Sequence, residues 1–340
     1  MAPARGAPRP SPPRPHRPHD PDPDPAGRAR RAAERRRGRR RPRLTAGGRH
    51  PLRPRRRGRG AHPVPPAPPG GAPLTEPVLI LAPTPSIYTG RGTNTYLVGD
   101  GPGLLCIDPG PDDPIHLEAV LGAAAARGGH IERILLSHSH IDHRPLARAL
   151  AERTGASVHA LEPGRADDGA RPLRDGERVR AGEVGLEVIA TPGHAADHLC
   201  FHEPDGGVLY SGDHILGGMT SVVNPPDGDM TAYMASLERV RALRPRVIHP
   251  GHGPRIDDAM ALIDEYLTHR RAREAEVERA VRERGGLVAP IDVVPQIYAA
   301  YPVALHPVAA RSVEAHLDKL AIEGRATRIV VDGEPRYRIP

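Results

Sequence analysis

The chain has 340 residues, a formal charge of +7, one phenylalanine and no tryptophan. The charge is unevenly spread, because residues 1–72 sum to +16 and residues 73–340 sum to −9. The excess of basic residues therefore does not mark the folded part as a nucleic-acid-binding protein. No run is long and apolar enough to span a membrane, and the N-terminus lacks the apolar core of a secretory signal. We therefore predict a cytoplasmic protein that does not contact membranes.

Residues 1–72 form an arm that is rich in arginine and proline and has no hydrophobic period. Such a segment cannot bury enough apolar surface to offset its chain entropy, so we predict that it is disordered. Three interpretations stay open: a basic tether for nucleic acid or an anionic surface, an inert tail, and an upstream start codon in a GC-rich reading frame. Blocks of like charge are usually solvated tails, which favours the last two.

After the arm, short β-rich runs alternate with amphipathic segments. We predict strands at Val78–Leu81, Thr95–Val98, Leu104–Ile107, Ile134–Leu136, Val184–Ile189, Leu199–His202, Val208–Tyr210 and Val247–His249. The helices predicted between them are Ile115–Arg127, Pro145–Arg153 and Thr231–Leu243. This mixture favours layered sheets covered by helices. The two cysteines, Cys106 and Cys200, lie in apolar runs without metal-binding spacing, which is typical of core residues in a reducing compartment.

The C-terminal part has a different texture. A long charged helix is predicted at Asp257–Arg284, followed by two shorter ones at Ile291–Ala300 and Pro307–Glu323. Two short strands, Arg328–Val331 and Arg336–Ile339, flank an Asp-Gly pair that is typical of a type I′ hairpin turn. Two helices and a hairpin in about 55 residues indicate a small winged-helix-like domain.

The run Ser-His-Ser-His-Ile-Asp-His at residues 137–143 carries the strongest chemical signal. In an extended chain, residues two apart point the same way, so His138 and His140 can share one metal ion. Asp142 and His143 follow at the turn into a helix and can serve a second ion. Imidazole and carboxylate are the ligands that zinc takes in catalytic sites. Four such groups in six residues predict a metal site rather than an ordinary polar loop.

Three further candidate ligands each follow a predicted strand and each lie beside a glycine. They are His194 in Thr-Pro-Gly-His, Asp213 in Ser-Gly-Asp and His252 in Pro-Gly-His-Gly. The glycines allow the backbone to approach closely. Each motif alone is weak, since a single histidine after a strand is most often structural. In this order and with the first run, they predict one shared site.

These motifs, in this order, resemble those of the metallo-β-lactamase superfamily. The resemblance implies an α+β fold, a four-layer αβ/βα sandwich, with two metal ions between the sheets, for which we expect zinc, with other divalent metals also able to fit. It assigns one ion to His138, His140 and His194. It assigns the other to Asp142, His143 and His252, with Asp213 bridging. Antibiotic-hydrolysing members commonly have a cysteine near the Asp213 position, so β-lactam hydrolysis is not the expected role.

A narrower resemblance rests on Gly92–Gly99, the runs TPGHAADH and SGDHILG, and His269–Glu274. These are similar to the β-lactamase-like-protein-2 family, whose members have a C-terminal winged-helix-like domain and include RNA endonucleases and thioesterases. The similarity covers about residues 76–335, although Arg144-Pro145 stands where small residues are expected. We predict a disordered arm at 1–72, a hydrolase domain at 73–285 and a winged-helix-like domain at 286–340.

The predicted chemistry is hydrolysis by a metal-bound hydroxide, which needs no serine or cysteine nucleophile. Asp142 is predicted to orient the hydroxide while it binds metal. The substrate is expected to be a small-molecule ester or thioester, or else a phosphodiester. One alternative is a single-strand RNA endonuclease whose winged helix aids RNA binding. Another is a nucleic-acid-binding regulator with a vestigial hydrolase domain, which the complete ligand set disfavours. The acidic body and its single phenylalanine also argue against an RNA platform. The sequence leaves the oligomeric state open.

Secondary positions have competing interpretations. His198 is the second catalytic candidate, which either lines the pocket and protonates the leaving group or makes a structural hydrogen bond. His214 is expected to be structural, because strand alternation turns it away from Asp213. Thr93 and Asn94 either support the floor of the site or form a turn. Three residues of the long helix either contact an anionic substrate or form a solvated face, and we expect the solvated face: His269, Arg270 and Arg273.

Overall fold

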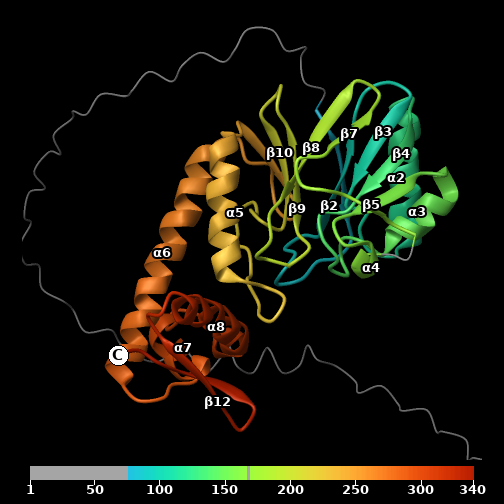
Figure 1. The fold of residues 1–340 in the computed structure, drawn as a ribbon. Helices are drawn as coiled ribbons and strands as arrows, with labels where there is room; N and C mark the ends of the chain where they lie inside the picture. Colours follow the sequence, from blue (N-terminus) through green and yellow to red (C-terminus); the bar gives the residue numbers. More distant parts are fainter. Residues whose placement is uncertain (1–75, 167–168) are drawn as a thin grey trace, which may run out of the picture. The chain divides into compact units, whose positions relative to one another are not determined.

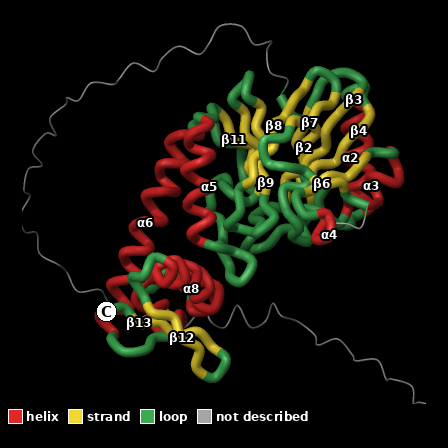
Figure 2. The backbone as a smooth tube through the Cα atoms, in the orientation of Figure 1, coloured by secondary structure: helices red, strands yellow, loops and turns green. Residues whose placement is uncertain are grey.

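In the computed structural model, which describes residues 76–166 and 169–340, two β-sheets face each other and helices cover their outer sides (Figures 1 and 2). The arm at residues 1–72, for which we predict disorder, lies outside the described residues. Residues 76–340 belong to one compact unit.

The first sheet has six strands in the order β1-β2-β3-β4-β5-β6. Their bounds are β1 Val78–Ala82, β2 Thr93–Val98, β3 Gly103–Ile107, β4 His130–Leu135, β5 Ser157–Ala160 and β6 Arg171–Pro172. Strands β1 to β3 pair antiparallel, and the pairs from β3 to β6 are parallel. The outer face packs against α2 (Pro114–Ala126) and α3 (Leu146–Thr154). A short helix, α4 (Pro163–Ala166), follows β5.

The second sheet has five strands in the order β11-β10-β9-β8-β7. Their bounds are β7 Arg178–Ala181, β8 Val184–Ala190, β9 Leu199–Glu203, β10 Val208–Gly212 and β11 Val247–Pro250. Within this sheet, only the β10–β11 pair is parallel. Its outer face packs against α5 (Met230–Leu243) and the first half of α6 (Ala259–Arg284).

Strand alternation explains the layers. In β2, Tyr96 and Val98 belong to the core between the two sheets, whereas Leu97 packs under the outer helices. In β9, Phe201 faces the other sheet and Cys200 faces α5. The longer strands in the middle of each sheet therefore contribute to two cores, because successive side chains point to opposite faces. The result is the predicted α+β, four-layer αβ/βα sandwich, and both cysteines are free and buried within it.

Three strands of the structure have no counterpart in our sequence prediction: β5, β6 and β7. Strand β6 has two exposed residues, and β7 alternates exposed arginines with buried Val179 and Ala181. Such short runs carry too little hydrophobic signal to be read alone. Pairing with longer neighbours stabilises them as strands.

The C-terminal part contains α7 (Pro290–Ile297), the 3-10 helix η2 (Val303–Leu305), α8 (His306–Ile322) and the hairpin β12 (Thr327–Val331) and β13 (Glu334–Arg338). The turn residues Asp332 and Gly333 both have positive φ, as the Asp-Gly pair predicts. The two helices and the hairpin enclose a separate apolar core around Val294, Leu317 and Tyr337.

Helix α6 takes part in two cores. Near its start, Ile263 and Leu267 pack in the core under the second sheet. Toward its end, Val277 and Val281 pack in the C-terminal core. The helix is charged along much of its length, and no helix among the described residues has the length and apolar character needed to cross a bilayer.

Candidate metal centre

The predicted ligands lie on loops that follow the carboxyl ends of four strands. His138 and His140 follow β4, His194 follows β8, Asp213 follows β10 directly, and His252 follows β11. The loops of both sheets meet at one edge of the sandwich, so residues far apart in sequence become neighbours. The structure brings together all seven predicted side chains, in two groups: His138, His140, His194 and Asp213, and then Asp142, His143 and His252.

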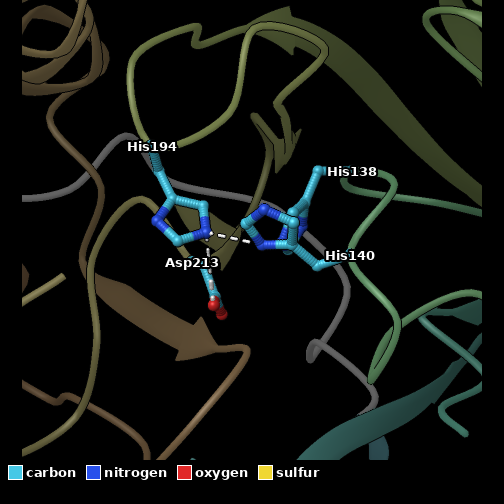
Figure 3. A group of neighbouring side chains, drawn as sticks. All are labelled: His138, His140, His194 and Asp213. Atoms are coloured by element: carbon cyan, nitrogen blue, oxygen red, sulfur yellow. Dashed lines mark hydrogen bonds and ion pairs between the residues drawn. The ribbon is translucent and has the colours of Figure 1, made fainter. Parts of the chain in front are cut away.

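In the first group, one ligand atom from each side chain lies within 4.8 Å of the others (Figure 3). His138 Nε2 lies 2.9 Å from His140 Nδ1, and His194 Nε2 lies 3.0 Å from the same atom. Asp213 Oδ2 lies 3.6 Å from His194 Nε2. Three imidazoles and one carboxylate thus point into a common space.

In the second group, His252 Nε2 lies 3.3 Å from both His143 Nε2 and Asp142 Oδ2. Asp213 also faces this group, with Oδ1 3.4 Å from His143 Nε2 and Oδ2 3.3 Å from His252 Nε2. Asp213 therefore stands between the two groups, which is the position that a bridging ligand requires.

Hydrogen bonds to the Nδ1 atoms fix the orientation of three of these imidazole rings. His194 Nδ1 lies 2.6 Å from the Val222 carbonyl, and His252 Nδ1 lies 3.1 Å from the Gly92 carbonyl. A carbonyl only accepts, so each Nδ1 carries the hydrogen, and each Nε2 points inward, where it can bind a metal ion once it has lost its own proton. His143 Nδ1 meets a carboxylate oxygen of Asp108 at 3.0 Å with the same consequence. This is how metal-binding histidines are oriented.

The donor set fits a metal site. Asp213 Oδ1 is buried and accepts no hydrogen bond from any described residue. Inward lone pairs of several imidazoles cannot satisfy one another, and buried polar atoms without partners are costly. Imidazole nitrogens and carboxylate oxygens are the ligands that zinc and similar divalent ions take. The seven side chains can therefore bind metal ions.

The two groups have opposite electrostatics in the absence of metal. Burial lowers the pKa of His138, His140 and His194, and the charge of neighbouring imidazoles lowers it further. Burial also acts to lower the pKa of His143 and His252. In both cases nearby carboxylates outweigh it, holding the pKa of His143 well above its ordinary value and raising that of His252 to about 9.

The pKa values of the two carboxylates in the site are shifted downward. Burial acts to raise the pKa of Asp213, but His143 and His252 hold it well below its ordinary value. The pKa of Asp142 is lowered by the same two imidazoles against the effect of burial. Two anionic carboxylates thus face a space where positive charge is favoured, and protons and metal ions compete for it.

The site opens into a cavity of about 1070 Å³, which five of the seven candidate ligands line. Much of the remaining wall comes from residues 84–89 and from the β10–α5 loop, residues 213–229. Helix α8 of the C-terminal part also contributes Pro307, Val308 and Arg311.

Comparison with known proteins places the chain in a family. Residues 88–252 match the Metallo-beta-lactamase superfamily, and residues 290–333 match the Beta-lactamase associated winged helix domain. A Beta-lactamase-like protein 2 homolog from Caenorhabditis elegans is 34% identical over 253 residues, covering 72% of this chain and 84% of the relative. The chain belongs to the metallo-β-lactamase superfamily. The homolog of the same name from Drosophila melanogaster is 34% identical over 271 residues, covering 74% and 90%.

Solved structures agree on the metallo-β-lactamase fold. A metallo-beta-lactamase family protein from Thermus thermophilus superposes with a TM-score of 0.65 at 23% identity, covering 78% of this chain and 98% of that one. A Beta-lactamase domain protein from Burkholderia ambifaria gives 0.67 at 22% identity, covering 77% and 91%. The predicted family and fold are therefore confirmed, including the C-terminal winged-helix domain.

Asp108 is a part of this metallo-β-lactamase site that the sequence analysis missed. It follows β3, and its carboxylate accepts hydrogen bonds from Ser137 N at 2.7 Å and Ser137 Oγ at 2.6 Å, besides facing His143. It thereby fixes both the start of the histidine run and the orientation of His143. Its signal was available, since it is an acidic residue placed directly after a predicted strand.

Thr93 and Asn94 support the floor of the site. Thr93 Oγ1 donates to Asp142 Oδ2 at 2.9 Å. The Asn94 side-chain amide donates to the carbonyls of Pro250 and Gly253 at 2.8 and 2.9 Å, which anchors the loop that carries His252. Of the two roles that we considered, the structure therefore shows support of the site.

The predicted catalytic role of His198 needs correction. Its side chain is fully buried and does not line the cavity. Its Nδ1 lies 2.9 Å from Thr191 Oγ1, and its Nε2 accepts from the backbone N–H of Asp213 at 3.1 Å. With both nitrogens occupied, His198 holds the backbone of Asp213 in place and cannot reach a leaving group.

The predicted solvated helix face is also wrong in part. His269 is exposed, but Arg270 is only 4% exposed. Arg273 lies 4.4 Å above the Tyr298 ring and pairs with Glu276 at 2.8 Å. Tertiary contacts with the second sheet's loops and the C-terminal core turn this face inward, which helix periodicity alone does not reveal.

Proposed function

We propose that this chain is a two-zinc hydrolase that cleaves an ester-like bond, preferably the thioester of a small molecule with an apolar acyl group. His138, His140 and His194 would hold one zinc ion, Asp142, His143 and His252 the other, and Asp213 both. Bound zinc would supply the acidity that activates water at neutral pH and would polarise the substrate carbonyl.

Asp142 has the position needed to orient the attacking water. Its side chain is 22% exposed and lines the cavity, and Oδ2 is held by Thr93 Oγ1 at 2.9 Å. Its low pKa keeps it ionised, so it can accept a hydrogen bond from the water throughout the neutral range. His198 has no part in this step.

The observation that carries the substrate assignment is the wall of the cavity. Ile87 and Ile141 line it while 72% and 79% exposed, and Tyr88 lies beside them at 49%. Exposed apolar side chains gathered at the mouth of a binding site favour an apolar ligand. An acyl chain would cover them, whereas a sugar-phosphate backbone would not.

Among the described residues, the cavity wall contains no lysine and a single arginine. Its one arginine, Arg311, donates Nε to Asn224 Oδ1 at 2.9 Å, Nη1 to Glu314 and Nη2 to the Pro225 carbonyl. These contacts leave it poorly placed to bind phosphate. RNA recognition depends on phosphate contacts, so this wall favours the small-molecule substrate.

A single-strand RNA endonuclease is the second candidate, and the winged-helix domain is the feature that favours it. Its weakness lies in the arginines of the wing. Arg325 pairs with Glu274 at 2.7 Å and with Glu323 at 2.9 Å, and Arg328 pairs with Asp318 at 3.1 Å. Cations with carboxylate partners contribute little to a phosphate-binding surface.

The test is turnover by the purified chain on two substrates. One is a series of acyl N-acetylcysteamine thioesters of increasing chain length, and the other is a labelled single-stranded RNA. We expect zinc-dependent hydrolysis that a chelator abolishes, with kcat/KM rising from acetyl to medium-chain thioesters, and loss of turnover in Asp142→Asn. Chelator-sensitive RNA cleavage without thioester hydrolysis would support the second candidate instead.

A further inference from the structure

We propose that Arg270 of α6 is a positioning residue for the metal centre, acting through the β10–α5 loop. The inference rests on the two-zinc site proposed above and adds a residue that is not a ligand and does not line the cavity. Arg270 belongs to the outer helix layer, yet its side chain is directed at the loop that carries Asp213.

The surroundings of Arg270 are unusual for a cation. It is 4% exposed, and its hydrogen bond to a described residue is to a backbone carbonyl and not to a carboxylate. Its Nη2 donates to the Ser221 carbonyl, its Cζ lies 5.1 Å from the centre of the Tyr233 ring, and its Nε has no hydrogen-bond partner among the described residues. Burying a cation without a carboxylate opposes folding, so stability alone does not account for an arginine here.

Ser221, the acceptor for Arg270, contacts two candidate ligands. Its hydroxyl donates to the Asp213 carbonyl at 2.5 Å and lies 3.3 Å from His194 Nδ1. The carbonyl of the next residue, Val222, accepts from His194 Nδ1 at 2.6 Å. By fixing the Ser221 carbonyl, Arg270 fixes the segment that aims the His194 ring and holds the backbone of Asp213.

The loop needs such an anchor because residues 213–229 contain no helix or strand. A second guanidinium holds it further along, where Arg311 of α8 contacts Asn224 and Pro225. The two anchors differ in consequence. Arg311 holds the wall of the cavity, whereas Arg270 holds the residues that orient metal ligands. Loss of ligand-orienting contacts typically weakens metal affinity by about 10- to 100-fold.

The experiment compares Arg270→Met with Arg271→Met in the full chain. Arg271 is the matched control, because it is exposed on the same helix and pairs only with Glu238 among the described residues, at 2.5 Å. Zinc affinity is measured by competition with a chromophoric chelator, and hydrogen exchange of residues 219–223 is measured in the metal-free protein. We expect Arg270→Met to bind zinc about 10-fold more weakly and to exchange faster, with the control like wild type.

Ser221→Ala tests the route. If Arg270 acts through Ser221, the double variant should lose less zinc affinity than the two single losses combined. Should Arg270→Met fail to fold, Arg270→Gln takes its place, and unchanged zinc affinity together with unchanged exchange in that variant would overturn the inference. Unchanged affinity and exchange in a folded Arg270→Met would do the same. A wild-type chain that binds no zinc would overturn the proposed function itself, which separates the two failures.

Discussion

Buried histidines occur in two very different settings in this chain. In the metal centre, His138, His143 and His252 are almost fully buried, and each directs one nitrogen to neighbouring imidazoles or carboxylates. In α8, His316 is equally buried at 1% exposure, but neither of its nitrogens has a hydrogen-bond partner among the described residues. Burial is common to both settings, so burial does not identify a metal site. A metal site is identified instead by several imidazole nitrogens that point into one space, which carboxylates also face.

Charged residues show the same contrast. In the C-terminal part, several exposed cations pair with carboxylates, such as Arg325 with Glu323 at 2.9 Å and Arg328 with Asp318 at 3.1 Å. In the metal centre the carboxylates of Asp142 and Asp213 face imidazoles, and no lysine or arginine of the described residues pairs with either. Paired surface charges contribute little to stability, whereas converging carboxylates that have no lysine or arginine partner create affinity for a metal cation. Substitutions of charged residues should therefore have large effects in the metal centre and small effects in the C-terminal part.

The largest effect is expected from Asp213→Asn. The variant keeps the shape but removes the charge that both groups share, so we expect it to lose most of one zinc ion per chain and more than about 100-fold in turnover. Elemental analysis of purified protein checks the metal, and thioester hydrolysis checks the activity. Two zinc ions per chain in this variant would break the comparison, because Asp213 would then not be shared.

His316→Leu should change the response to acid. Burial, with Arg270 nearby, lowers the pKa of His316 to about 3, below the ordinary 6.5. Between these two values the unfolded chain binds a proton that the folded chain does not. The free energy of unfolding of the wild type should therefore decrease as the pH is lowered through that window. Relative to His316→Leu, we expect a loss of about 1.4 kcal/mol per pH unit, or about 2 kcal/mol between pH 6.5 and 5.

Urea denaturation of the two proteins at pH 7 and pH 5 measures this difference. His130→Gln is the control, because the His130 side chain is 65% exposed. If wild type and His316→Leu lose the same stability on acidification, His316 is not buried as a neutral group, and the contrast with the metal centre fails.

Ile141→Ser should separate long from short substrates. Ile141 lines the cavity at 79% exposure, so an acyl chain that covers it gains about 1.5 kcal/mol or more, close to 10-fold in kcat/KM. We expect that loss for medium-chain thioesters and almost none for acetyl thioester. Equal losses on both would show that Ile141 supports the loop of the metal ligands rather than the substrate.

The smallest effect is expected in the wing. Replacing Arg325, Arg328, Arg336 and Arg338 with glutamine should leave thioester turnover within about twofold of wild type, with little dependence on salt, since none of them lines the cavity. The control is the wild-type chain measured across the same salt series. A steep salt dependence of cleavage, lost in the fourfold variant, would favour the RNA endonuclease.

The sequence predicts the local parts of the site well. His138, His140, Asp142 and His143 lie within six residues, and the glycine next to each later ligand is needed where it stands. At Gly251, an added Cβ would collide with Asp213 Oδ1. The histidine run and the glycines beside the later ligands are short motifs that can be recognised without the fold, although the contact that requires Gly251 is long-range.

The contacts that the sequence does not predict are long-range. Asp108 reaches Ser137 across 29 positions, and Arg270 reaches Ser221 across 49. The role of His198 could not be decided from the sequence, because spacing from His194 puts it near the site but does not say which way its ring faces. The short strands β5 to β7 were missed for the same reason, since their neighbours in the sheets stabilise them.

Helix α6 has a consequence for how the chain unfolds. At 26 residues it is about 39 Å long, and its two ends are packed in different cores. If either core unfolds, α6 loses packing on that side, and the other core also depends on α6. The chain should therefore lose both domains in one cooperative transition, and a fragment cut at residue 285 would expose Val277, Ala280 and Val281 to water. We therefore expect the domain boundary at residue 285 to be visible in the sequence but not as a separate step in unfolding, because α6 belongs to both cores.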